Sequence, residues 1–231
     1  MCELRTAARV SNSKESAGNA ATVNRFKPGR GTGDQGRSSL YTNERLWKDE
    51  RIFESLGCLD ELSSNLGLCR QLAYDRGLFD VAELLLKLQC CLQDIGSHVA
   101  TPQASVSERR STQHRIERTK FDSDLVAELD AWIDEHAEPL PPLKQFILPG
   151  GGVLACQLHV ARSICRRTER CLASLIRQQS IEEPAYKYVN RLSDFLFVLA
   201  RRACQLEGES EVLYQKPDTF AVPRKWATRK L

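Results

Sequence analysis

Five stretches of the chain repeat apolar residues at the spacing of an amphipathic α-helix. They cover residues 49–74, 77–100, 122–137, 153–178 and 184–207. In the first stretch, Ile52, Leu59 and Leu66 recur with the helical period and face one side, which can enter a core. There is no convincing strand pattern and no internal repeat. This pattern predicts an all-α bundle of about five helices with short connections.

Polar segments lie at both ends of the chain and between the predicted helices. Residues 1–28 lack apolar periodicity, and their basic residues outnumber the acidic ones, which predicts a disordered tail or an organelle transit segment. Residues 29–47 form a Gly-rich loop, residues 103–119 a polar, mobile loop, and residues 215–231 a basic tail. We therefore expect one domain over residues 29–214.

The charge balance and the cysteines narrow the possible functions. The net charge is only +3, from 33 basic and 30 acidic residues, so nothing favours a nucleic-acid partner or a membrane surface. No run approaches the roughly 18 apolar residues of a membrane span. Most of the nine Cys lie in apolar helical patterns, which indicates a reducing intracellular compartment. With no C-x-x-C pair and four scattered His, no metal site is predicted.

The fourth predicted helix carries the most informative polar face. At about 100° per residue, Arg162, Arg166 and Glu169 fall within an arc of roughly 60°. Two guanidiniums and a carboxylate on one helix face form a rigid receptor for polyphosphate or for a carboxylate of a partner. The alternative is a charged stripe that faces solvent.

The fifth predicted helix has a similar division between an apolar and a polar face. Asn190, Arg191 and Asp194 lie within about 100° of each other, away from the apolar side. Such a set holds a guanidinium in place or binds a ribose hydroxyl. The alternative is an intrahelical ion pair worth about 0.2–0.5 kcal/mol.

Three further positions are candidates for chemistry. The loop from Thr32 to Gly36 offers backbone N–H groups suited to phosphate, although it is not a Walker A motif and turns of this composition are common. Asp60 and Glu61 lie inside the first helix, where a carboxylate beside the apolar stripe meets an Arg from another helix or subunit or stays a surface acid. Phe146 precedes a Pro-Gly turn, and its local pattern favours core packing.

Taken together, five motifs in this order resemble the PduO-type ATP:cob(I)alamin adenosyltransferases, and the mitochondrial animal form in particular. They are Thr32-Gly33-Asp34-x-Gly36, Asp60-Glu61-Leu62-Ser63-Ser64, Phe146-Ile147-Leu148-Pro149-Gly150-Gly151, His159-Val160-Ala161-Arg162-x-x-Cys165-Arg166-Arg167-x-Glu169-Arg170 and Tyr188-x-Asn190-Arg191-Leu192-Ser193-Asp194-Phe195-Leu196-Phe197. The resemblance covers residues 30–214.

The resemblance implies a five-helix bundle that assembles as a homotrimer, with ATP at each subunit interface and the corrinoid beside it. The implied reaction moves the 5′-deoxyadenosyl group of ATP onto cobalt and leaves triphosphate, with Mg²⁺ accompanying the nucleotide. It also implies a mitochondrial matrix location, or a cytoplasmic one if the N-terminus is not a transit signal. A cobalamin reductase system and methylmalonyl-CoA mutase are the implied partners.

The resemblance also assigns roles to residues. Arg162, Arg166 and Glu169 fall in the nucleotide site, where Arg166 stabilises the leaving triphosphate. Asp60 matches an acid that pairs with Arg162 across the interface, and Phe146 matches an aromatic residue that displaces the lower axial ligand of cobalt. The implied nucleotide-binding set is Thr32, Gly33, Asp34, Gly36, Lys48, Arg166, Glu169, Asn190, Arg191 and Asp194.

The sequence departs from the family pattern at the nucleotide loop. The family usually reads Tyr-Thr-Lys-Thr-Gly-Asp, whereas Gly29, Arg30 and Gly31 precede Thr32 here, so the Lys is missing. Losing that point charge should weaken ATP binding, unless Arg30 or Arg37 compensates. An altered N-terminus over residues 1–31, or an unusual splice form, is the other explanation. Asn43 also stands where the family usually has Gly.

Three rival interpretations remain on these residues. The first is a non-catalytic paralogue that binds or chaperones cobalamin and has a compromised nucleotide loop. A ferritin-like metal bundle needs Glu-x-x-His pairs, and none occurs. A helical nucleic-acid binder is disfavoured by the acidic residues interleaved among the basic ones.

Overall fold

The computed structural model describes residues 31–103 and 110–217 and divides the chain into two units, residues 1–35 and residues 36–231. Of the first unit, residues 31–35 are described. They form a turn in which the Asp34 N–H donates to the Gly31 carbonyl oxygen at 3.1 Å.

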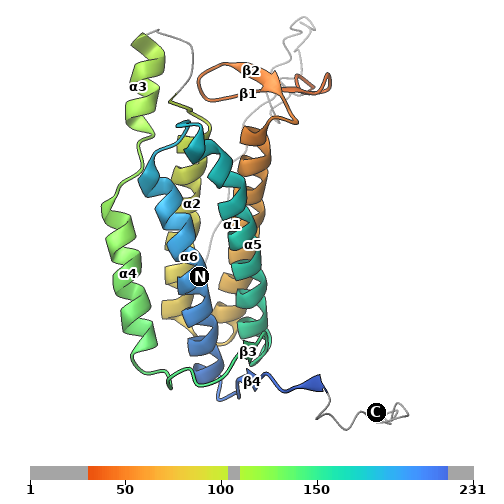
Figure 1. Ribbon diagram of the computed structural model, residues 1–231, viewed down its shortest axis with the longest axis vertical. Helices are drawn as coiled ribbons and strands as arrows, with labels where there is room; N and C mark the ends of the chain where they lie inside the picture. The colour runs from red at the N-terminus through yellow and green to blue at the C-terminus, as the bar shows by residue number, and fades with distance from the viewer. Residues whose placement is uncertain (1–30, 104–109, 218–231) are drawn as a thin grey trace, which may run out of the picture. The chain divides into compact units, whose positions relative to one another are not determined.

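The second unit is mostly helical. Its long helices are α1 (Arg51–Asp75), α2 (Phe79–Val99), α4 (Asp124–Ala137), α5 (Val153–Arg177) and α6 (Glu183–Leu206). All five predicted helices are therefore confirmed, with ends within about two residues of the expected ones. Figure 1 shows α1, α2, α5 and α6 running side by side.

The region expected to be a polar loop contains a sixth helix, α3 (Arg110–Arg118). The prediction of a loop throughout residues 103–119 was wrong because it relied on apolar periodicity, which this polar segment lacks. Arginine, glutamine and glutamate in the segment nevertheless favour helix. The Arg115 guanidinium lies 5.3 Å from the ring centre of Tyr41, a cation–π contact with the loop that precedes α1.

One core joins the long helices. α5 packs against both α1 and α6, α1 packs against α2, and α6 packs against α4. Lys87 of α2 lies 5.0 Å from the ring centre of Trp132 on α4 and forms an ion pair with Glu128, so α2 also meets α4. The largest completely buried side chains include Leu62, Leu66, Leu85, Leu88, Leu158, Leu172, Tyr188 and Phe195. The polar faces of α5 and α6 are thus held in a fixed relation by the apolar faces beneath them.

Four short strands correct the prediction that the chain contains no strand. β1 (Arg37–Ser39) and β2 (Arg45–Trp47) form an antiparallel hairpin, and β3 (Ile147–Leu148) pairs antiparallel with β4 (Val212–Leu213). Strands of two or three residues are too short to show a period-2 alternation. In the hairpin turn, Asn43 has φ = +68°, a left-handed conformation that Asn tolerates, which explains why it can replace a Gly.

The three Gly residues before α5 serve a tight turn into that helix. Gly151 has φ = +87°, and a Cβ there would lie 2.5 Å from the Cys204 Sγ of α6. A Cβ on Gly150 would lie 2.5 Å from a methyl carbon of Val212 on β4. These close contacts with α6 and β4 leave no room for side chains at Gly150 and Gly151, so the tight turn requires Gly there.

Across the described part of the chain, no helix is long and apolar enough to cross a membrane.

Candidate functional site

The polar faces of α5 and α6 meet at Glu169. The Asn190 amide on α6 donates a hydrogen bond of 2.8 Å to a Glu169 carboxylate oxygen on α5. Tyr186 lies close to Glu169, and burial together with that carboxylate raises the pKa of Tyr186. Sequence reasoning missed Tyr186, although it lies one helical turn before Asn190 and therefore shares its face. Glu169 is thereby fixed at the edge of the α5 polar face.

The two arginines of this face are held differently. Arg166 is exposed, and no ion pair involves its side chain among residues 31–103 and 110–217. The Arg162 guanidinium lies 5.9 Å from the ring centre of Phe197 on α6, which sequence reasoning also missed. Its Nε is buried and has no hydrogen-bond partner in the same ranges. The face therefore presents one free guanidinium, at Arg166, and one partly buried guanidinium with unused donor capacity.

Arg191 is not part of the Glu169 cluster. Its guanidinium forms an ion pair of 2.5 Å with Asp130 of α4 and a longer one of 3.7 Å with Asp194. The alternative of an intrahelical ion pair is therefore observed for Arg191 and Asp194. Of the three polar residues expected on this face of α6, only Asn190 contacts Glu169, because Arg191 lies one residue further round the helix and faces α4.

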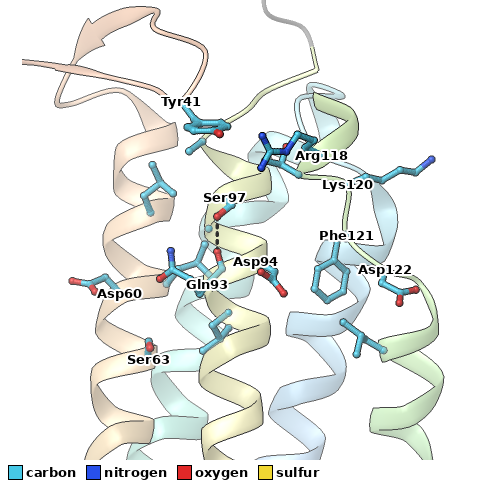
Figure 2. A pocket seen from close by; sticks show the side chains of 17 residues that line it. Tyr41, Asp60, Ser63, Gln93, Asp94, Ser97, Arg118, Lys120, Phe121 and Asp122 are labelled. Atoms are coloured by element: carbon cyan, nitrogen blue, oxygen red, sulfur yellow. Dashed lines mark hydrogen bonds between the residues drawn. The ribbon is translucent and has the colours of Figure 1, made fainter. Parts of the chain in front are cut away.

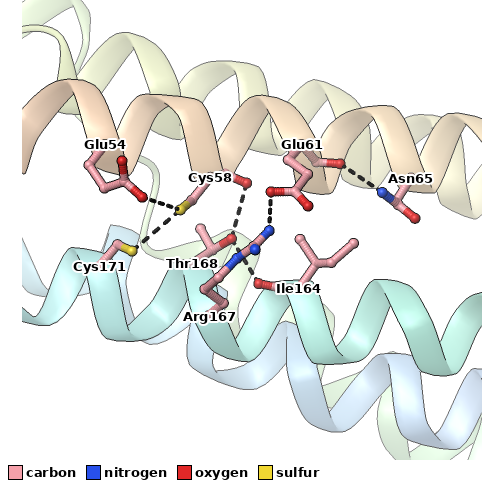
Figure 3. Close-up of polar contacts among 8 residues, drawn as sticks. All are labelled: Glu54, Cys58, Glu61, Asn65, Ile164, Arg167, Thr168 and Cys171. Carbon is pink, nitrogen blue, oxygen red and sulfur yellow. Dashed lines mark hydrogen bonds and ion pairs between the residues drawn. The ribbon is translucent and has the colours of Figure 1, made fainter. Parts of the chain in front are cut away.

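The acidic pair of α1 meets α5 through Glu61 (Figure 3). Glu61 forms an ion pair with Arg167, which holds the pKa of the Glu61 carboxyl below its usual range by a direct hydrogen bond. Deeper in the same seam, the Thr168 hydroxyl donates to the Cys58 carbonyl oxygen at 3.1 Å. The expectation that an acid of α1 meets an Arg of another helix is thus confirmed for Glu61.

Asp60 points away from this seam. It is exposed, and within the described ranges no ion pair involves it. Its side chain lines a pocket of about 710 Å³ between α1, α2 and the segment before α4 (Figure 2). Ser63, Gln93 and Lys120 line the same pocket. Neither Arg166 nor Glu169 does, so in one chain this pocket and the α5 face are separate surfaces.

Phe146 lies on the surface. Its side chain is 83% exposed, which makes the core-packing interpretation wrong. Its backbone is held, because the carbonyl oxygen accepts a 2.8 Å hydrogen bond from the Tyr214 N–H just beyond β4. A fixed backbone that carries an exposed aromatic ring is suited to stacking against a flat, apolar ligand surface.

The nucleotide-loop residues fall into both units. Thr32, Gly33 and Asp34 belong to the first unit, and Gly36 and Lys48 to the second, where the Lys48 N–H donates to the Gly36 carbonyl oxygen at 2.9 Å. Two arginines were proposed to replace the missing Lys. One is Arg37, whose guanidinium lies 4.7 Å from the ring centre of Trp47. The other, residue 30, lies outside the described ranges, as do residues 1–28 and most of the basic tail.

The fold and these motifs place the chain in a known class: it belongs to the cobalamin adenosyltransferase family, whose family model matches residues 30–203. It is 44% identical over 187 residues to the corrinoid adenosyltransferase MMAB of Mus musculus, covering 81% of this chain and 76% of that protein. It is 37% identical over 186 residues to a corrinoid adenosyltransferase of Bacillus subtilis, covering 80% of this chain and 90% of that protein.

A solved structure has the same fold. It is a variant PduO-type ATP:corrinoid adenosyltransferase from Lactobacillus reuteri complexed with cobalamin and ATP. The TM-score is 0.68 at 33% sequence identity, with 80% of this chain and 97% of that chain covered. The expected family membership is confirmed.

Proposed function

We propose that this protein transfers the 5′-deoxyadenosyl group of ATP to the cobalt(I) of cobalamin, giving adenosylcobalamin and triphosphate. The observation that carries the proposal is the α5–α6 face, where exposed Arg166 lies beside a Glu169 that Asn190 holds at 2.8 Å. Family membership and the Lactobacillus reuteri enzyme bound to both substrates support the same reaction.

The reaction requires the protein mainly to position the two substrates. Cobalt(I) is itself the nucleophile: its electron pair forms the Co–C5′ bond while the C5′–O bond breaks and its pair leaves with triphosphate. No side chain needs activation as a nucleophile. The protein holds C5′ over cobalt and stabilises the charge that grows on the leaving group. An exposed guanidinium with no competing carboxylate, as at Arg166, is suited to that second task.

The carboxylates of the face are suited to the magnesium ion that accompanies a nucleotide. Mg²⁺ prefers oxygen ligands and keeps several of its waters, so one or two carboxylates suffice. Glu169 and Asp194 supply such oxygens on α5 and α6. By the family resemblance, Thr32, Gly33, Asp34, Gly36 and Lys48 are also proposed to bind the nucleotide. A bound Mg²⁺ would offset part of the triphosphate charge.

Phe146 is proposed to face the lower side of the corrinoid. A ring on that side excludes water and the dimethylbenzimidazole base from cobalt. The resulting four-coordinate cob(II)alamin is easier to reduce to the nucleophilic state. The 83% exposure of the ring supports this role, because a buried ring could not reach a bound corrinoid.

We also propose a homotrimer of five-helix bundles with active sites between subunits. Asp60 is exposed without an ion pair, and Arg162 has a buried, unused Nε, both judged over residues 31–103 and 110–217. An Asp60–Arg162 pair across an interface would satisfy both groups. The mitochondrial matrix is the proposed compartment, with delivery to methylmalonyl-CoA mutase and reduction by a cobalamin reductase system.

The altered loop is expected to weaken ATP binding without abolishing it. Arg30→Ala and Arg37→Ala should each raise the KM for ATP further if these arginines replace the missing Lys. An ATP affinity that equals that of relatives with the Lys, and that neither substitution changes, would show that the loop is not compromised.

An anaerobic adenosylation assay tests the main proposal. Purified protein, ATP, Mg²⁺ and chemically reduced cobalamin are mixed, and visible absorbance follows formation of the Co–C bond. Appearance of adenosylcobalamin is the expected result. A shift of cob(II)alamin to the four-coordinate spectrum without turnover would instead identify a non-catalytic cobalamin-binding paralogue.

A further inference from the structure

Two cysteines and one glutamate that are not assigned to ATP or corrinoid meet on the seam between α1 and α5. Glu54 and Cys58 lie one turn apart on α1, and Cys171 faces them from α5 (Figure 3). The two Sγ atoms are 3.3 Å apart, and Cys58 Sγ is 3.9 Å from a Glu54 carboxylate oxygen. One ligand atom from each of the three residues lies within 4.8 Å of the other two.

We propose that Cys58, Cys171 and Glu54 bind a thiophilic divalent cation of the Zn²⁺ class. A tetrahedral zinc site has Zn–S bonds of about 2.3 Å, which places two thiolate sulfurs about 3.8 Å apart. The observed separation therefore needs to open by only about half an ångström, which side-chain rotation can supply. Two thiolates and one carboxylate leave the fourth position for water.

Charge neutralisation favours a cation at this cluster. Two thiolates beside the Glu54 carboxylate would repel one another, and a bound cation would offset that repulsion. The cation replaces the two thiol protons, which leave to solvent.

The cluster of Cys58, Cys171 and Glu54 is open to solvent, unlike the other buried cysteines. Glu54 is exposed and Cys171 is half-buried, so an ion can reach the cluster from solvent. Cys69 and Cys165 are buried, and Cys165 donates its S–H to the Val189 carbonyl oxygen at 3.2 Å.

Sequence reasoning predicted no metal site because it looked for ligands close together along the chain. Here 113 positions separate Cys58 from Cys171, and only the packing of α1 on α5 brings them together. The proposal is independent of the adenosyl-transfer reaction, since neither cysteine is assigned to that site.

The test is a metal titration of the full-length, reduced protein. Zn²⁺ affinity is measured by competition with a chromophoric chelator, and Co²⁺ serves as a spectroscopic probe for thiolate-to-cobalt charge transfer. The wild-type protein should bind one ion at this cluster, release two protons per ion and show the charge-transfer band. Cys90→Ser, which removes an exposed thiol of α2 outside the cluster, is the matched control and should behave like the wild type.

Cys171→Ser and Glu54→Gln should each weaken Zn²⁺ binding by about tenfold or more. Removing a residue that only hydrogen-bonds to a metal ligand already lowers metal affinity by about that factor, and removing a ligand itself should lower the affinity at least as much. Glu54→Gln keeps both thiols and changes only an exposed side chain, so misfolding would not mimic its effect. Equal Zn²⁺ affinity in wild type, Cys171→Ser and Glu54→Gln would overturn the proposal. Absence of the charge-transfer band, or an intramolecular disulfide that forms in the presence of Zn²⁺, would overturn it as well.

Discussion

Arg166 offers the sharpest test of how the α5 face works. The side chain is exposed, and its guanidinium has no ion pair over residues 31–103 and 110–217. Replacing it with Ala removes no buried contact and substitutes the residue with the best helix propensity. The free energy of unfolding should therefore change by less than about 0.5 kcal/mol, the usual range for surface positions.

The effect on catalysis should be much larger. If Arg166 contacts the triphosphate as the C5′–O bond breaks, its removal takes away a charge-assisted donor aimed at developing negative charge. Losing one such donor costs about 100- to 1,000-fold in kcat, or about 2.7–4 kcal/mol. The KM for ATP should rise less than kcat falls, because the contact strengthens as the leaving group gains charge.

The assay is steady-state formation of adenosylcobalamin under anaerobic conditions, with thermal unfolding measured on the same preparations. Arg177→Ala is a matched control, since Arg177 lies on the same side of α5 about 16 Å further along the axis. Arg177→Ala should retain normal turnover. Wild-type turnover in Arg166→Ala, or an equal loss in both variants, would refute the assignment of Arg166 to the leaving group.

Three more predictions follow from individual contacts. Phe146→Ala should leave the thermal midpoint of unfolding nearly unchanged, because the ring is 83% exposed. The substitution should lower turnover by about tenfold or more. The spectroscopic signal of four-coordinate cob(II)alamin, measured with ATP present, should be lost. Thr168→Val removes the hydroxyl that donates to the Cys58 carbonyl at 3.1 Å and should cost about 1 kcal/mol in urea unfolding, whereas the exposed Ser64→Ala should cost almost nothing. Burial lowers the pKa of His98 below 6.5, and its Nε2 accepts a 2.9 Å hydrogen bond from the Glu182 N–H. As pH falls, the His98 imidazole is therefore protonated in the unfolded chain before it is protonated in the folded one, so the free energy of unfolding should fall as pH drops through 6.5. Urea unfolding midpoints measured against pH should show this decrease, and His98→Gln should make it smaller.

The long helices could be predicted because each one carries its own signal. α1, α2, α4, α5 and α6 all bury apolar residues at helical spacing, and that pattern is present in the sequence before any packing occurs. Helix α3 could not be found in this way, since Ile116 is its single apolar residue and cannot form a periodic pattern. Strands β3 and β4 pair residues about 65 positions apart, so their partners are defined only by the folded chain.

The candidate site was predictable where it depends on a single helix face. The polar faces of α5 and α6 were expected, and the contact between Glu169 and Asn190 joins them. The partner of Arg191 was not predictable, because Asp130 becomes its neighbour only when α4 packs on α6. The exposure of Phe146 was missed for a related reason: an aromatic residue is usually buried, and nothing in its local sequence shows that it lies at a surface turn.

The pairing of β3 with β4 has a consequence for protein synthesis. The segment that carries Phe146 is held by the Tyr214 N–H, close to the end of the described chain. About 65 residues separate Leu148 from Leu213, so at roughly 5–20 residues per second the ribosome makes β3 about 3–13 seconds before its partner strand. During that interval α5 and α6 emerge and can begin to pack. The segment that carries Phe146 still lacks its hydrogen bond from the Tyr214 N–H. The corner that carries Phe146 therefore takes its final form only after β4 has been made.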